Sequence, residues 1–170
     1  MRSVWIGTAL LALGLVGVRN APAAEDDTAW KSYVEAGSSY VRAAEDATNG
    51  RDRRDNIERA AGQFQAAVSI GRDKSAWRPV VMAADGYVRM AQAVTGNDKD
   101  NYTDLAISAL DSATGIAKAK ADGNGLRDVV RVYRRLARNS AGAKLKAIEA
   151  KIKLTEQDAE GMPAGKERGR

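Results

Sequence analysis

The chain has 170 residues, a formal net charge of +5, and neither cysteine nor histidine. These two absences exclude disulfides, a lipidated N-terminal cysteine, thiol catalysis and Ser-His-Asp catalysis, and they remove the commonest zinc ligands. The net charge is too small to indicate nucleic-acid binding on its own. We therefore expect a non-enzymatic protein without cofactor, metal or nucleic-acid partner, although a hydrolase that uses carboxylates alone stays open.

Residues 1–23 are predicted to be a secretory signal peptide. Arg2 precedes an apolar run from Val4 to Val18, and small residues around Ala23 then mark a cleavage site. The run is shorter than the ~20 residues of a typical membrane span, which favours cleavage near Ala23 over a retained anchor. We therefore expect the chain either to reside in a bacterial periplasm or to be secreted.

Residues 24–160 are predicted to form one all-α domain, because the composition is alanine-rich and apolar residues recur at helical spacing. The expected helices are 28–48, a second whose buried stripe runs from Ile57 to Gly71, then 77–94, 102–120, 126–139 and 143–158. Glycine and asparagine mark breaks at 49–50, 96–98 and 122–125. Residues 161–170 are expected to be a flexible basic tail.

A pattern of aromatic and small residues recurs along this domain. The segment 30–44 returns at 77–91, and a weaker copy occupies 126–137. The matched tyrosines, 47 and then 46 residues apart, are Tyr40, Tyr87 and Tyr133. A period of about 20–50 residues indicates a repeat array, in which each unit buries its apolar face against its neighbours.

Two motifs inside the first repeat resemble those of the tetratricopeptide family. They are Tyr33-x-x-Ala36-Gly37-x-x-Tyr40 and Ala60-x-x-x-Phe64-x-x-Ala67, with looser copies at 80–87 and 106–113. The units here are longer than the family's ~34 residues, so either the helices or the turns between them must be longer. The resemblance implies three tandem antiparallel helical hairpins that form a short right-handed α-solenoid. A six-helix bundle formed by duplication is the alternative.

The same resemblance implies a scaffold that binds a protein or peptide partner in the cell envelope through a concave helical face. The matched tyrosines are one candidate set, because a row of hydroxyls can hydrogen-bond a peptide backbone; the alternative is that they pack in the core. Trp30 and Trp77 occupy matched positions and are expected to pack in the core or between repeats.

The second candidate set is an arginine-rich side of the predicted helix 126–139. Its members are Arg127, Arg131, Arg134, Arg135 and Arg138, whose spacing places them on one side of the helix. Such a side can bind an acidic protein, an anionic lipid surface or a polyanion, or it can simply be solvated. The rival function is therefore a small helical bundle that binds an apolar ligand or an anionic membrane surface. The oligomeric state stays open, although uncapped terminal repeats favour self-association.

Overall fold

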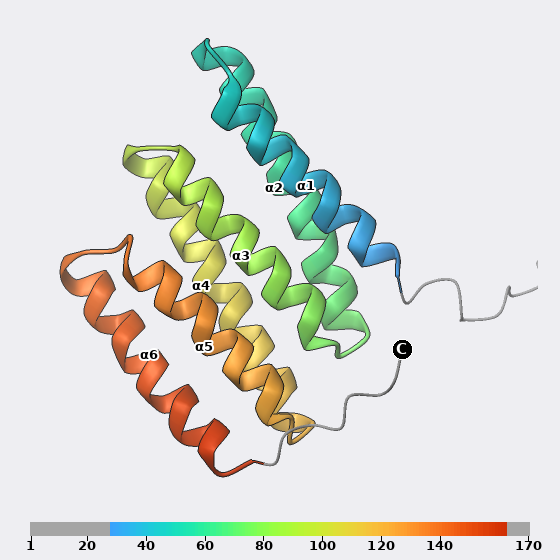
Figure 1. Ribbon diagram of the computed structural model, residues 1–170, viewed down its shortest axis with the longest axis vertical. Coiled ribbons are helices and arrows are strands. Elements are labelled where there is room, and N and C mark those ends of the chain that lie inside the picture. The colour runs from blue at the N-terminus through green and yellow to red at the C-terminus, as the bar shows by residue number, and fades with distance from the viewer. Residues whose placement is uncertain (1–27, 163–170) are drawn as a thin grey trace, which may run out of the picture.

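The computed structural model describes residues 28–162, which form six α-helices and no strands (Figure 1). The helices are α1 (Ala29–Asp46), α2 (Gly50–Asp73), α3 (Trp77–Ala93), α4 (Gly96–Ala119), α5 (Gly123–Ala137) and α6 (Gly142–Glu160). The all-α prediction is confirmed for these residues. The predicted signal peptide, 1–23, and residues 163–170 of the predicted tail lie outside the described residues.

Successive helices pair as hairpins: α1 with α2, α3 with α4, and α5 with α6. We call α1, α3 and α5 the first helices, and α2, α4 and α6 the second helices. Among the first helices, α3 contacts both α1 and α5, whereas α1 touches neither α5 nor α6 within the described part of the chain. The hairpins therefore stand in a row, each against the next (Figure 1).

Each second helix starts at a glycine, and α4 begins earlier than predicted because its glycine resembles a break. These glycines are Gly50, Gly96 and Gly142, at intervals of 46 residues. Gly96 and Gly142 have φ angles of +64° and +58°, a left-handed conformation that glycine adopts without steric cost. The predicted break at 96–98 is therefore the first turn of α4, and the predicted start at 102 was wrong.

The fifth helix also begins inside a predicted break. Asp122 caps α5, and one of its carboxylate oxygens accepts hydrogen bonds from the backbone N–H groups of Asn124 and Gly125, at 3.0 and 3.1 Å. The extra residues of each repeat lie in the helices, since α2 and α4 have 24 residues each and the connection from α1 to α2 is only three residues long.

Phe64 of α2 holds the first two hairpins together. Its side chain is fully buried, and a Cβ atom added to Gly37 of α1 or Gly86 of α3 would lie 2.7 or 2.3 Å from its ring. The ring therefore lies directly against the backbone of both helices, an approach that only glycine permits. Tyr87 of α3 adds an edge-to-face contact, with ring centroids 5.7 Å apart.

Candidate functional site

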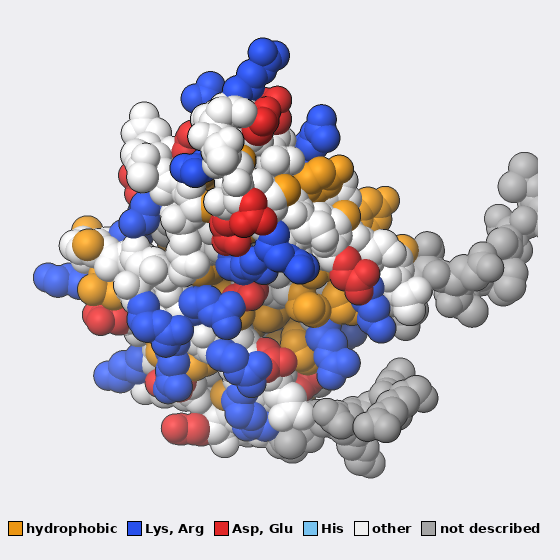
Figure 2. All heavy atoms as spheres, turned by 45° about the horizontal axis from the view of Figure 1, so that its top comes forward, with side chains coloured by type: hydrophobic (Ala, Val, Ile, Leu, Met, Phe, Trp, Pro, Cys, Tyr) orange, Lys and Arg blue, Asp and Glu red, His pale blue; other side chains and the backbone are white. Residues whose placement is uncertain are grey.

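A row of neighbouring cavities, which we call the groove, lies on the side of the molecule where the first helices meet. Three cavities of about 190, 350 and 680 Å³ form it, and we call them the apolar, middle and arginine cavities. The apolar and middle cavities share Val34 and Met82, and the middle and arginine cavities share Arg131 and Arg135. The groove thus runs from α1 across α3 and α5 to α6. Figure 2 shows hydrophobic side chains in a hollow between basic side chains.

The apolar cavity lies between α1 and α3. Trp30 and Val34 line it from α1, and Met82 lines it from α3. Met82 is 47% exposed, although it is a large apolar residue. Trp30 is partly buried, and the ammonium group of Lys31 lies 5.9 Å from its ring centroid. This end of the groove therefore offers apolar side chains to a ligand.

The middle cavity is bordered by Trp77, which joins the second hairpin to the third. Its indole Nε1–H donates a hydrogen bond of 2.9 Å to Asp122, the residue that caps α5. A Cβ atom on Gly125 would lie 2.9 Å from the same indole, so the ring packs closely against the first turn of α5. Trp30 has the matched position one repeat earlier, but the residue that caps α3 is Ala76, which has no side-chain acceptor.

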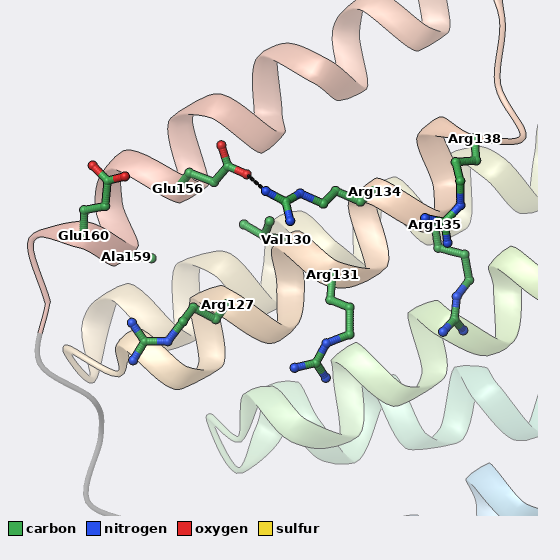
Figure 3. A pocket seen from close by; sticks show the side chains of 9 residues that line it. All are labelled: Arg127, Val130, Arg131, Arg134, Arg135, Arg138, Glu156, Ala159 and Glu160. Atoms are coloured by element: carbon green, nitrogen blue, oxygen red, sulfur yellow. Dashed lines mark hydrogen bonds and ion pairs between the residues drawn. The ribbon is translucent and has the colours of Figure 1, made fainter.

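The arginine cavity brings together all five arginines that the helical spacing placed on one side. They are Arg127, Arg131, Arg134, Arg135 and Arg138. The lining also includes Val130 of α5 and, from α6, two glutamates and an alanine. Figure 3 shows Arg131 and Arg135 extending toward α3, and Arg134 extending toward α6. The cavity therefore combines a small apolar floor with side chains that carry five positive charges.

Three of these arginines form ion pairs inside the groove. The pairs are Arg131 with Asp128 at 2.9 Å, Arg134 with Glu156 at 2.6 Å, and Arg135 with Asp85. Arg127 donates instead to the side-chain oxygen of Asn124 at 2.9 Å. Arg138 has no carboxylate partner among residues 28–162. The two ends of α5 thus present arginines whose charge no carboxylate of the described chain offsets.

The three predicted tyrosines lie on the other side of the first helices, against the second helices. Tyr87 packs on Phe64 of α2, and the Tyr133 hydroxyl donates a hydrogen bond of 2.6 Å to Asp111 of α4. Both rings are buried, whereas Tyr40 is half-buried beneath the Arg59 guanidinium. Burial favours packing over a recognition row for Tyr87 and Tyr133, since neither lines a cavity of the groove.

The buried tyrosines are also difficult to ionise. Burial raises the pKa of Tyr87 to about 12, and the nearby Arg72 offsets part of this increase. Burial also raises the pKa of Tyr133, and the hydrogen bond to Asp111 raises it further. Both effects favour the neutral phenol. These hydroxyls are therefore structural groups at neutral pH, and neither is prepared to act as a base.

Other kinds of site find little support within the described residues. No group of three or more potential metal-ligating side chains occurs there. None of the described helices has a stretch that is both long and apolar enough to cross a membrane. A separate cavity of about 520 Å³ lies between α2 and the start of α4, and it shares no lining residue with the groove.

The helical spacing predicted the arginine-rich side of α5, but not the cavity there or the contribution of α3 to the groove. Met82, Asp85 and Arg89 lie on α3 and line the middle cavity. Met82 had a detectable signal, because it is an apolar residue outside the buried stripe of its helix. The role of Asp85 depends on how α3 and α5 pack, which no local spacing indicates.

Comparisons with known protein families, curated proteins and solved structures found no match for this chain.

Proposed function

We propose that the chain is an exported, non-enzymatic scaffold of the bacterial envelope that binds a segment of a partner protein in the groove. In this proposal residues 24–160 form a tetratricopeptide-like, short right-handed α-solenoid. The observation that carries the proposal is the row of cavities across all three hairpins, in which neighbouring cavities share lining residues. An apolar floor with polar groups placed at its border is the usual composition of a binding site.

The arrangement of the hairpins supports a solenoid over a closed bundle. A closed bundle brings its first and last helices together, whereas α1 and α6 share no contact among the described residues. The first helices instead contact one another in order, α1 to α3 and α3 to α5. This order gives adjacent first helices one common face, which is where helical-repeat scaffolds bind their partners.

The proposed function can be tested with a photo-crosslinking amino acid at two matched positions. Met82 lies in the groove and is 47% exposed; Leu105 lies on α4, outside the groove, and is 44% exposed. Incorporation in the producing bacterium in place of Met82 should yield a discrete protein adduct, identified by mass spectrometry. Incorporation in place of Leu105 should not yield that adduct. Adducts with lipid alone, or equal adducts from both positions, would contradict the proposal.

Export has a separate test. If residues 1–23 are a cleaved signal peptide, the protein recovered from the producing cell begins at or near Ala24 and is found outside the cytoplasm. Intact-mass measurement of periplasmic and membrane fractions checks this result. An uncleaved chain in the membrane fraction would indicate a retained anchor instead.

A further inference from the structure

We infer that the ligand of the groove is a bipartite protein segment: one large apolar residue, which enters the apolar cavity, and at least two carboxylates, which bind along α5. The inference rests on the proposed function and names the chemical features of the segment that binds in the groove. It depends on a difference between the two ends of the groove. One end is apolar and lies in the first hairpin, whereas the other is basic and lies in the third.

The apolar end has room for one large side chain. Its cavity has a volume of about 190 Å³, and apolar cavities of about 150 Å³ are known to hold a benzene ring. Trp30 and Met82 provide the walls, and Met82 is almost half exposed. Trp77 at the matched position is held by Asp122, but Trp30 has no such acceptor at Ala76. Trp30 is therefore the tryptophan that remains available for a ligand.

The basic end has more positive charge than its own carboxylates offset. Seven arginines and four carboxylates line the middle and arginine cavities, and no lysine lines either one. Within residues 28–162, Arg78, Arg127 and Arg138 have no ion-pair partner. The guanidinium group binds carboxylate oxygens in a two-pronged geometry, which the lysine ammonium group cannot reproduce. The surplus charge and its chemistry both fit an acidic ligand.

The spacing of these arginines sets the spacing of the ligand's carboxylates. Arg127 and Arg138 are eleven residues apart at the two ends of α5, which corresponds to about 17 Å along a helix. An extended segment advances about 3.3 Å per residue, so about five residues cover this distance. Carboxylates about five positions apart can then bind both arginines, while an apolar residue between them lies on Val130.

A protein segment fits these features better than a bilayer does. Binding in the plane of a membrane requires a broad apolar face. The large exposed hydrophobic residues of the described chain are separated on four helices: Tyr33 on α1, Met82 on α3, Leu105 on α4 and Leu154 on α6. No single described helix therefore presents more than one such residue. The arginines instead border a hollow in which a narrow chain can lie.

The first test is selection of random twelve-residue peptides, displayed on phage, by the full chain carrying a C-terminal tag. Recovered peptides should be enriched in aspartate and glutamate and should carry a large apolar residue at a recurrent position. Recovered peptides that are neutral or basic would overturn the inference but leave the proposed function intact. Recovery of no specific peptide would overturn both.

The second test uses matched variants and the recovered acidic peptides, with binding followed by fluorescence anisotropy. Arg127→Gln combined with Arg138→Gln should weaken binding at least tenfold. Lys146→Gln combined with Lys153→Gln removes the same charge from exposed positions on α6 that do not line the groove, and should change binding less than twofold. Equal losses in the two double variants would overturn the inference.

A third pair of variants tests the apolar end. Met82→Glu should weaken binding of these peptides about tenfold, whereas Leu105→Glu, on the exposed side of α4, should leave it unchanged. Circular dichroism establishes that each variant is folded. Vesicles of anionic phosphatidylglycerol provide the alternative ligand. Vesicle binding that depends on Arg127 and Arg138 and that the acidic peptides do not reduce would overturn the inference.

Discussion

The two sides of this molecule use positive charge in different ways. Three lysine bridges join α4 to α6: Lys118 to Asp158, Lys144 to Asp104 and Lys151 to Asp111, at 2.9, 2.8 and 2.7 Å. The cations of the middle and arginine cavities, on the first-helix side, are all arginines. Arg134 and Arg135 also bridge helices, to Glu156 of α6 and Asp85 of α3, but Arg127 and Arg138 have no carboxylate partner among residues 28–162.

The difference follows from the chemistry of the two side chains. A lysine stem is long and flexible and ends in a compact charge, so it can reach a carboxylate on a helix with little direct backbone contact. An arginine offers a rigid set of donors suited to a carboxylate that approaches from outside. The bridging lysines are therefore engaged within the chain, whereas Arg127 and Arg138 on the first-helix side are available to a ligand.

The substitution with the largest expected effect on stability removes the ring that holds the first two hairpins together. Phe64→Ala should lower the free energy of unfolding by about 3–5 kcal/mol, because it leaves a cavity against Gly37, Gly86 and Tyr87. Urea unfolding followed by circular dichroism measures this loss. A loss below about 1 kcal/mol would show that the ring is not the centre of this junction.

A pH series tests the layer of tyrosines between the two sides. The pKa of Tyr87 is raised to about 12 by burial, so the folded state holds this proton more tightly than the unfolded state. Stability is therefore fully present below pH ~10 and falls as pH rises toward ~12, by roughly 2 kcal/mol from this residue. Urea unfolding at several pH values should show a weaker alkaline loss in Tyr87→Phe. An identical slope in both proteins would contradict the assignment.

The link between the second and third hairpins can be tested through the cap of α5. Asp122→Ala removes the acceptor of the Trp77 indole and the cap of α5, and should cost about 2 kcal/mol. Trp30→Phe should cost less than Trp77→Phe, because Trp30 lacks the matching acceptor. Thermal unfolding of the variants checks both expectations. Equal effects of the two tryptophan substitutions would contradict the proposed asymmetry between the repeats.

Substitutions of the charged residues should have the smallest effects on stability. They should also affect the two sides of the molecule differently. Lys151→Met removes a partly exposed bridge and should cost at most about 1 kcal/mol of stability without altering peptide binding. Arg138→Gln should change stability by less than about 0.5 kcal/mol while it weakens peptide binding. Chemical unfolding and peptide titration of the two variants give the comparison. The opposite pattern would show that the roles of the two sides are exchanged.

Local spacing predicted those features that depend on one helix alone. Ile57, Phe64 and Gly71 are buried as their helical periodicity indicated, since a single helix buries one stripe. The five arginines lie together for the same reason. The starts of α4 and α5 were missed, because Gly96 and Asp122 resemble breaks until their backbone and side-chain capping roles are known.

Features that depend on contacts between helices could not be predicted from spacing. The hydrogen bond from Trp77 to Asp122 joins residues 45 positions apart. Asp85 becomes part of the groove only because α3 lies beside α5. The sequence predicted that the three tyrosines occupy matched positions, but a repeated position does not indicate which neighbouring helix a side chain faces. In the structure Tyr87 and Tyr133 face the second helix of the preceding hairpin.

The most direct test of the groove as the binding face is the fluorescence of Trp30. A recovered acidic peptide without tryptophan should shift the emission of the full chain saturably. Most of the shift should be lost in Trp30→Phe, because Trp30 lines the apolar cavity, whereas Trp77 borders the middle cavity and is held by Asp122. The emission shift should also decrease as salt is added, because salt screens the attraction between the arginines and the acidic peptide. An undiminished shift in Trp30→Phe, or a saturable peptide interaction that leaves Trp30 emission unchanged, would contradict binding in the groove.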